Sequence, residues 1–135
     1  MIKPLKYYNI LIFIIILLYS VSASAQISDV NNQIISAVSK GDAHELSGNF
    51  NQNISVKTDN DEGDFSKTQS EVRLNDFFRR NKPLSFTVES KGGLSSNSEY
   101  IIGKFKTSKH TFRVYILIKE ISAQKLINQI SFEKE

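Results

Sequence analysis

Cysteine and tryptophan are both absent from this chain of 135 residues. Without cysteine there can be no disulfide, no thiolate metal ligand and no thiol nucleophile, and the lipid-anchored cysteine of a bacterial lipoprotein is also excluded. The fold must therefore be held by its hydrophobic core. The roughly 110 residues after the N-terminal segment suffice for one such core, because a chain of this size buries about 65% of its unfolded surface.

A strong excess of either charge is also lacking. The chain has 17 Lys and Arg residues against 14 Asp and Glu residues, which gives a net charge of +3. Removal of Lys3 and Lys6 with an N-terminal signal would leave 15 against 14, or +1. The one tight basic cluster, Arg79-Arg80-x-Lys82, fits a solvated helix C-terminus. Nucleic-acid binding needs a basic stripe with interleaved aromatics, so no nucleic-acid partner is expected.

No apolar run is long enough to span a bilayer comfortably. The run from Ile10 to Leu18 follows two lysines and ends in small residues up to Ala25, whereas a spanning helix needs about 20 apolar residues. This order is typical of a secretory signal with an Ala23-x-Ala25 cleavage site. We predict a signal peptide over residues 1–25 and a mature domain over 26–135, with no membrane span after cleavage; an uncleaved anchor is the alternative.

Helical periodicity dominates the first half of the mature chain. A stripe of apolar residues at helical spacing predicts a helix over 27–40, and Gly41 suits its end. Asp42 and Glu45 have capping-box spacing for a short second helix up to Phe50. The remaining segments up to Pro83 are a strand over 54–58, a polar turn over 60–64, and a helix over 66–80 with Ser66 and Gln69 as a second capping box.

After Pro83 the apolar period becomes two. Strands are expected over 84–88, 100–107, 111–119 and 125–132, with a flexible link over 91–98. In the third of these strands the alternate residues Phe112, Val114, Ile116 and Ile118 are all apolar, so helices should cover that face. The predicted fold is α+β, in which three N-terminal helices cover one face of a curved antiparallel sheet of about four to five strands.

The order of several short motifs resembles a known family. The motifs are Lys40-Gly41-Asp42 at a helix end, Asp76-Phe77-Phe78-x-x-Asn81, Ser85-Phe86-Thr87-Val88 and Phe112-Arg113-Val114-Tyr115-x-Leu117-x-Lys119. Together they resemble family 4783 of the domains of unknown function. The resemblance implies a nuclear-transport-factor-like (cystatin-like) cone with an internal pocket, and export into the periplasm or beyond in a Gram-negative bacterium. It implies no activity, since such a scaffold hosts isomerases, dehydratases and binding modules.

The implied pocket suggests two hypotheses. Phe77, Phe112, Val114 and Ile116 would line it and would suit a small apolar ligand. Alternatively, an isomerase- or dehydratase-like enzyme would place a carboxylate base and a hydroxyl donor in the same pocket. The candidate residues for that chemistry are Asp76 with Tyr100 or Tyr115.

Metal ligands are sparse. His44 and His110 are the sole histidines, and we expect both to be exposed because a zinc site needs three or four converging ligands. The acids of residues 59–64 suggest calcium by composition, but their spacing does not match an EF-hand loop. No metal or cofactor is expected.

One further pair favours binding rather than catalysis. Arg113 and Tyr115 should lie on the sheet face that the helices leave open, and both residue types are enriched at interfaces. This face would join two subunits or bind another envelope protein, although pairing of these side chains with neighbouring strands is the alternative. The leading hypothesis is a non-catalytic envelope protein that binds a small ligand or a protein.

Overall fold

The structure is a computed structural model that describes Ile12 and residues 29–135. The predicted signal peptide and its cleavage site lie outside the described residues, apart from Ile12. None of the described helices is both long enough and apolar enough to cross a membrane. The elements in chain order are α2 (Val30–Lys40), α3 (Ala43–Ser47), β1 (Phe50–Lys57), β2 (Glu62–Ser66), α4 (Lys67–Arg80), β3 (Pro83–Ser95), β4 (Ser98–Thr107), β5 (Thr111–Ile121) and β6 (Gln124–Lys134).

Helices α2 and α4 end at the predicted residues, whereas α3 ends at Ser47, and Phe50, which was expected at the end of that helix, begins β1. Gly41 has a left-handed backbone, with φ 66° and ψ 35°, and terminates α2. The Asp42 side chain accepts a hydrogen bond from the backbone N–H of Glu45 at 2.9 Å and so starts α3. Ser66 and Gln69 form both hydrogen bonds of a capping box at the start of α4. The predicted end of α2 at Gly41 and the predicted N-caps at Asp42 and Ser66 are confirmed.

The sheet has six strands in the order β2-β1-β6-β5-β4-β3, so the prediction of four to five strands was too low. The missed strand is β2, which lies in the segment interpreted as a polar turn. It pairs antiparallel with β1, with Phe65 opposite Ile54. Acidic residues and a glycine made this segment look like a loop, but an edge strand can be anchored by one side chain, and half-buried Phe65 packs against the core.

The sheet is also not wholly antiparallel. The last strand, β6, lies between β5 and β1 and runs parallel to β1. Strands β3 to β6 form the predicted meander because short turns join them. Strands β1 and β6 are far apart in the chain, with β2, α4 and the strands β3 to β5 between them. Because no tight turn joins β1 to β6, the two can pair in parallel.

Strand β3 is longer than expected and includes the predicted flexible link. Gly92 and Gly93 lie in the ladder, opposite Tyr100 and Glu99. A side chain at Gly92 would lie 3.4 Å from the Tyr100 ring. Both glycines are therefore paired residues of β3, and this part of the predicted link is a strand.

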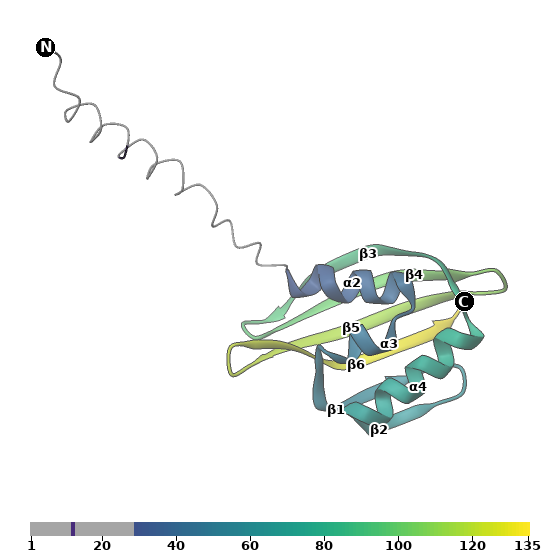
Figure 1. Cartoon of the computed structure of the whole chain (residues 1–135), viewed down its shortest axis with the longest axis horizontal. Helices are drawn as coiled ribbons and strands as arrows, with labels where there is room; N and C mark the ends of the chain where they lie inside the picture. Colours follow the sequence, from purple (N-terminus) through teal and green to yellow (C-terminus); the bar gives the residue numbers. More distant parts are fainter. Residues whose placement is uncertain (1–11, 13–28) are drawn as a thin grey trace, which may run out of the picture.

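The three helices cover one face of the curved sheet, with α2 beside β3 and α4 over β1 and β2 (Figure 1). The predicted inner face of β5 is confirmed, since Phe112, Val114, Ile116 and Ile118 are at most 1% exposed. The buried apolar side chains of the described residues form one core between helices and sheet. The opposite face of the sheet carries no helix among the described residues (Figure 1).

Candidate functional site

The space under the helices, where a ligand pocket was predicted, is filled by core side chains. Phe77, Phe112, Val114 and Ile116 each have 0% exposed surface. The ring centroid of Phe77 lies 4.5 Å from that of Phe132 and 5.1 Å from that of Phe112. A side chain that lined a ligand-sized void would keep accessible surface, and these four keep none. They pack at the density of a protein interior, so the structure does not arrange them around a pocket.

The candidate acid and hydroxyl for catalysis are not brought together. Asp76 lies on the exposed side of α4, where its carboxylate is 3.7 Å from the Arg79 guanidinium. Tyr100 lies on β4 between residues that face the helices, so its ring is on the open face of the sheet, and its hydroxyl is 3.2 Å from that of Ser90. Tyr115 shares that face. The sheet therefore separates Asp76 from both tyrosines.

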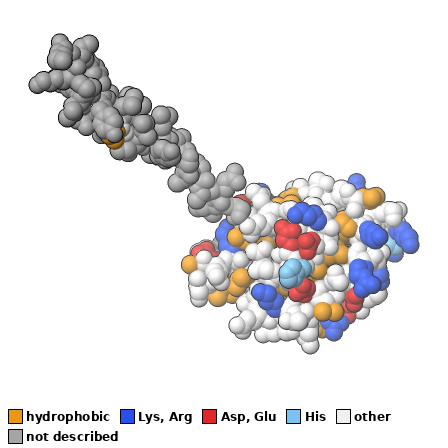
Figure 2. All heavy atoms as spheres, in the orientation of Figure 1, with side chains coloured by type: hydrophobic (Ala, Val, Ile, Leu, Met, Phe, Trp, Pro, Cys, Tyr) orange, Lys and Arg blue, Asp and Glu red, His pale blue; other side chains and the backbone are white. Residues whose placement is uncertain are grey.

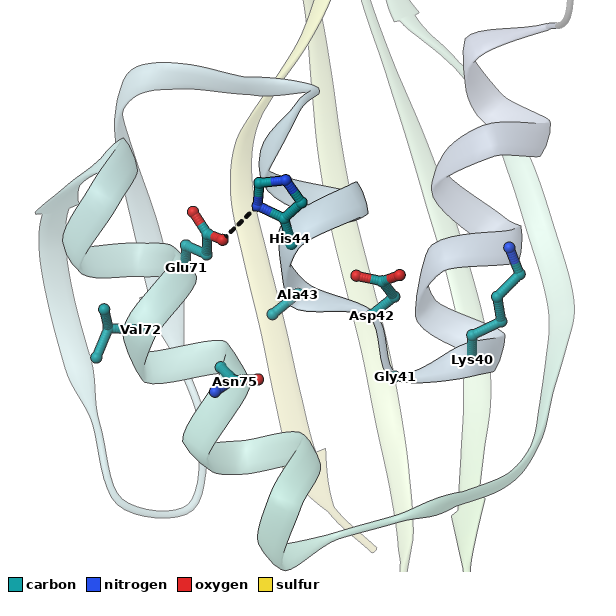
Figure 3. Close-up of a pocket in the computed structure, with 8 residues that line it drawn as sticks. All are labelled: Lys40, Gly41, Asp42, Ala43, His44, Glu71, Val72 and Asn75. Carbon is teal, nitrogen blue, oxygen red and sulfur yellow. Dashed lines mark hydrogen bonds and ion pairs between the residues drawn. The ribbon is translucent and has the colours of Figure 1, made fainter.

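A cleft of about 560 Å³ opens on the helix-covered face instead. It lies where the corner between α2 and α3 meets α4 (Figure 3). The corner is tight because Gly41 is left-handed and packs against Pro83, which would lie 3.1 Å from an added Cβ. Acidic side chains and a histidine gather near the middle of this face, with basic side chains around them (Figure 2). The cleft is lined by Lys40, Gly41, Asp42, Ala43, His44, Glu71, Val72 and Asn75.

The one bond across this cleft joins His44 of α3 to Glu71 of α4 (Figure 3). The His44 Nδ1 and Glu71 Oε1 atoms are 2.8 Å apart. A carboxylate can only accept, so Nδ1–H donates and Nε2 of a neutral ring keeps its lone pair. His44 has 91% of its side chain exposed, as predicted, while Glu71 has 32%. No local pattern predicts this pair, because its members are 27 residues apart.

The second histidine differs from its prediction. His110 is half-buried, and its ring lies nearly perpendicular to that of Phe112 at 6.1 Å between centroids. The turn that carries it closes against β5, which brings the imidazole onto the edge of the core. The prediction of an exposed His110 was therefore wrong in degree.

The acids of residues 59–64 are engaged with other side chains. Asp59 pairs with Arg80 at 3.0 Å, and Asp61 pairs with Arg73. These two ion pairs tie the turn between β1 and β2 to α4. Within the described residues no group of three or more His, Cys, Asp or Glu side chains is placed to hold a metal ion.

The open face of the sheet has an apolar centre. Residues directly opposite each other on β4 and β5 share a face, and on this face Tyr100 is opposite Leu117 and Ile102 is opposite Tyr115. All four are half-buried. No helix of residues 29–135 covers them (Figure 1), so the surface is available to a partner.

Arg113 lies at one end of this apolar centre and makes no ion pair within residues 29–135. Its cross-strand neighbour Glu133 pairs with Lys57 at 3.1 Å, and its other neighbour, Lys104, lies 3.7 Å from both Glu89 and Glu135. The hydrogen bond to Glu133 raises the pKa of Lys57 above its ordinary value. Lys104 lies directly opposite Arg113, as the alternative of cross-strand pairing expected, and these two cations form no ion pair with each other.

Comparison with known proteins identifies the family. The model of the domain of unknown function DUF4783 matches residues 31–133. The chain belongs to this family. A DUF4783 protein from Bacteroides uniformis, solved by crystallography, is 25% identical with a TM-score of 0.75, and the match covers 79% of this chain and 98% of that one. No curated protein matches the chain.

More distant structures share the fold alone. A domain of unknown function with a cystatin-like fold from Nostoc punctiforme is 12% identical with a TM-score of 0.62, over 78% of this chain and 72% of that one. An NTF-2-like protein of unknown function from Silicibacter pomeroyi is 11% identical with a TM-score of 0.57, over 78% and 90%. The predicted family and its nuclear-transport-factor-like, cystatin-like fold are confirmed. The family name carries no activity, so function must be argued from the surfaces described above.

Proposed function

We propose that this chain is an exported, non-catalytic binding protein that associates with a second copy of itself through the open face of its sheet. Export to the periplasm or beyond rests on the signal-peptide pattern of residues 1–25. The observation that carries the binding proposal is the uncovered apolar centre around Tyr115, beside the unpaired Arg113.

The composition of this surface suits protein association. Tyrosine and arginine are enriched at the residues that contribute most to interfaces. A twofold dimer needs a self-complementary surface. Here the neighbouring bases Lys104 and Arg113 lie between acidic Glu89 and Glu133 at one end of an apolar centre. Two copies can therefore come together without repulsion between surfaces of the same charge. The side chains under the helices keep no exposed surface, which favours the open face over a small apolar ligand in that space.

Light scattering tests this function. The protein concentrations, about 10–200 µM, span the dissociation constants typical of weak dimers. We expect a dimer for the mature wild type, and monomers for Tyr115→Asp and Arg113→Ala, because the first puts a charge in the apolar centre and the second removes the arginine at its end. Val72→Asp is the matched control, since Val72 is 58% exposed on the helix face, and it should remain dimeric. A wild type that stays monomeric throughout this range contradicts self-association.

The cleft across α3 and α4 favours a second candidate, an acid–base enzyme. There Glu71 orients His44, as a carboxylate orients a general base. We rank it second because His44 is almost fully exposed and no buried donor faces it within the described residues. Mass spectrometry of host small molecules incubated with wild type or with His44→Ala separates the two, because a product formed by wild type alone would favour the enzyme.

A further inference from the structure

A polar groove crosses the open sheet face beside the apolar centre. Two hollows of about 350 and 210 Å³ share Ser55, Asp64 and Gln129 in their linings, so they form one continuous depression. Together they run over β2, β1 and β6 and reach Leu117 and Lys119 on β5. We call this depression the strand groove. It lies on the opposite side of the sheet from the helix cleft.

Irregular strand pairing creates this groove. Pairing between β1 and β6 shifts register between Phe50 and Ser55, and pairing between β5 and β6 shifts after Leu117. Such bulges break the regular side-chain alternation and re-aim side chains. In the gap Asn51 donates a hydrogen bond from Nδ2 to Oδ1 of Asn128 at 3.1 Å. The polar side chains at the groove are therefore set by the strands themselves.

The groove offers both donors and acceptors to a ligand. The side-chain amides of Asn53 and Gln129 make no hydrogen bond within residues 29–135, and each supplies two N–H donors and one carbonyl acceptor. The Asp64 carboxylate accepts a hydrogen bond from the Ser55 hydroxyl and has further acceptor capacity. A matching ligand must donate and accept at several neighbouring points, as a row of hydroxyl groups does.

The charges of the groove balance. Its lining holds two bases, Lys57 and Lys119, and two acids, Glu62 and Asp64. A ligand with several charges of one sign would meet like charge at some point along it. The apolar contact is Leu117 at one end, directly opposite Tyr100 on the neighbouring strand. This combination suits a ring that has hydroxyls at its edges and C–H groups on its faces.

We propose that the strand groove binds a neutral oligosaccharide. The amides of Asn53 and Gln129 and the Asp64 carboxylate hydrogen-bond to its hydroxyls, and Leu117 contacts the C–H face of one sugar ring. The groove shares Leu117 with the self-association surface, and its other residues except Lys119 lie on β1, β2 and β6, so oligosaccharide binding and self-association are tested by separate measurements.

Backbone amide NMR of the mature protein tests the proposal with four neutral probes, namely maltotriose, cellotriose, mannotriose and triacetylchitotriose. We expect at least one to shift amides of β1, β2 and β6, and we expect the dissociation constant to rise about tenfold in Gln129→Ala and in Asn53→Ala. Asn75→Ala, on the helix face, is the control and should bind as wild type does. The spectrum of each free variant shows whether it is folded.

Three results would overturn the proposal. The first is that none of the four probes shifts groove amides at 20 mM, a concentration about tenfold above a millimolar dissociation constant. The second is that folded Gln129→Ala binds as tightly as wild type. The third is that the amide shifts are confined to the helix face. Light scattering on the same samples reports self-association separately, so failure of one proposal is distinguishable from failure of the other.

Discussion

Single residues in the core show why the predicted pocket is filled. The apolar character of Phe77 and Phe112 was evident from their spacing, but the same spacing serves a pocket wall or a packed core. Whether a pocket wall or a packed core forms depends on how many large side chains enter the same space. Here Phe78, Phe105 and Phe132 also enter it, with ring centroids within 6 Å of at least one other ring of this cluster.

Truncation of one of these rings tests the filled core. Phe77→Ala should lower the free energy of unfolding by about 3–5 kcal/mol, because it removes a fully buried ring and leaves a cavity. Urea denaturation measures the loss. Val72→Ala on the same helix, at 58% exposed, should change stability by less than about 0.5 kcal/mol. Equal, small losses for both variants would mean that the space under the helices is not tightly packed.

At the scale of elements, glycine positions show how closely the strands approach one another. Gly103 lies in the middle of β4, on the face that the helices cover. In the structure an added Cβ at Gly103 would lie 2.6 Å from the carbonyl oxygen of Thr87 and 2.7 Å from the Phe86 ring. The neighbouring strand β3 also shifts register between Val88 and Ser90. The glycine therefore permits close contact between β3 and β4.

Gly103→Ala should lower the free energy of unfolding by about 1–3 kcal/mol, because backbone atoms must move to admit the methyl group. Thermal or urea unfolding followed by circular dichroism gives the value. In the same sheet, Gly93→Ala is the control, since the nearest atom to an added Cβ is 4.0 Å away. If Gly103→Ala is as stable as Gly93→Ala, β3 and β4 do not pack as described.

At the scale of the whole molecule, stability should not depend on a metal ion. The core of the described residues is apolar, and Asp59 and Asp61 are bound to arginines. Dialysis against a chelator should therefore leave the melting temperature unchanged, which differential scanning calorimetry measures. A clear drop that added calcium or zinc reverses would reveal a metal site and contradict this expectation.

Features that depend on near neighbours could be predicted from the order of the residues alone. Helix caps at Asp42 and Ser66, the end of α2 at Gly41 and the buried face of β5 all follow from residues within a few positions of one another. The fold class follows from the change of apolar period at Pro83. These patterns are readable because 3.6- and 2-residue periods act locally.

Which distant segments meet could be seen in the folded structure but not in the sequence. The strand β2, the parallel pairing of β1 with β6, the contact of His44 with Glu71 and the strand groove all join residues that no local pattern links. Which of these segments pair depends on how the helices pack on the sheet and on which strand edges are still unpaired as the chain folds. The filling of the core was decided in the same way, since each apolar stripe is visible in the sequence but the space they share is not.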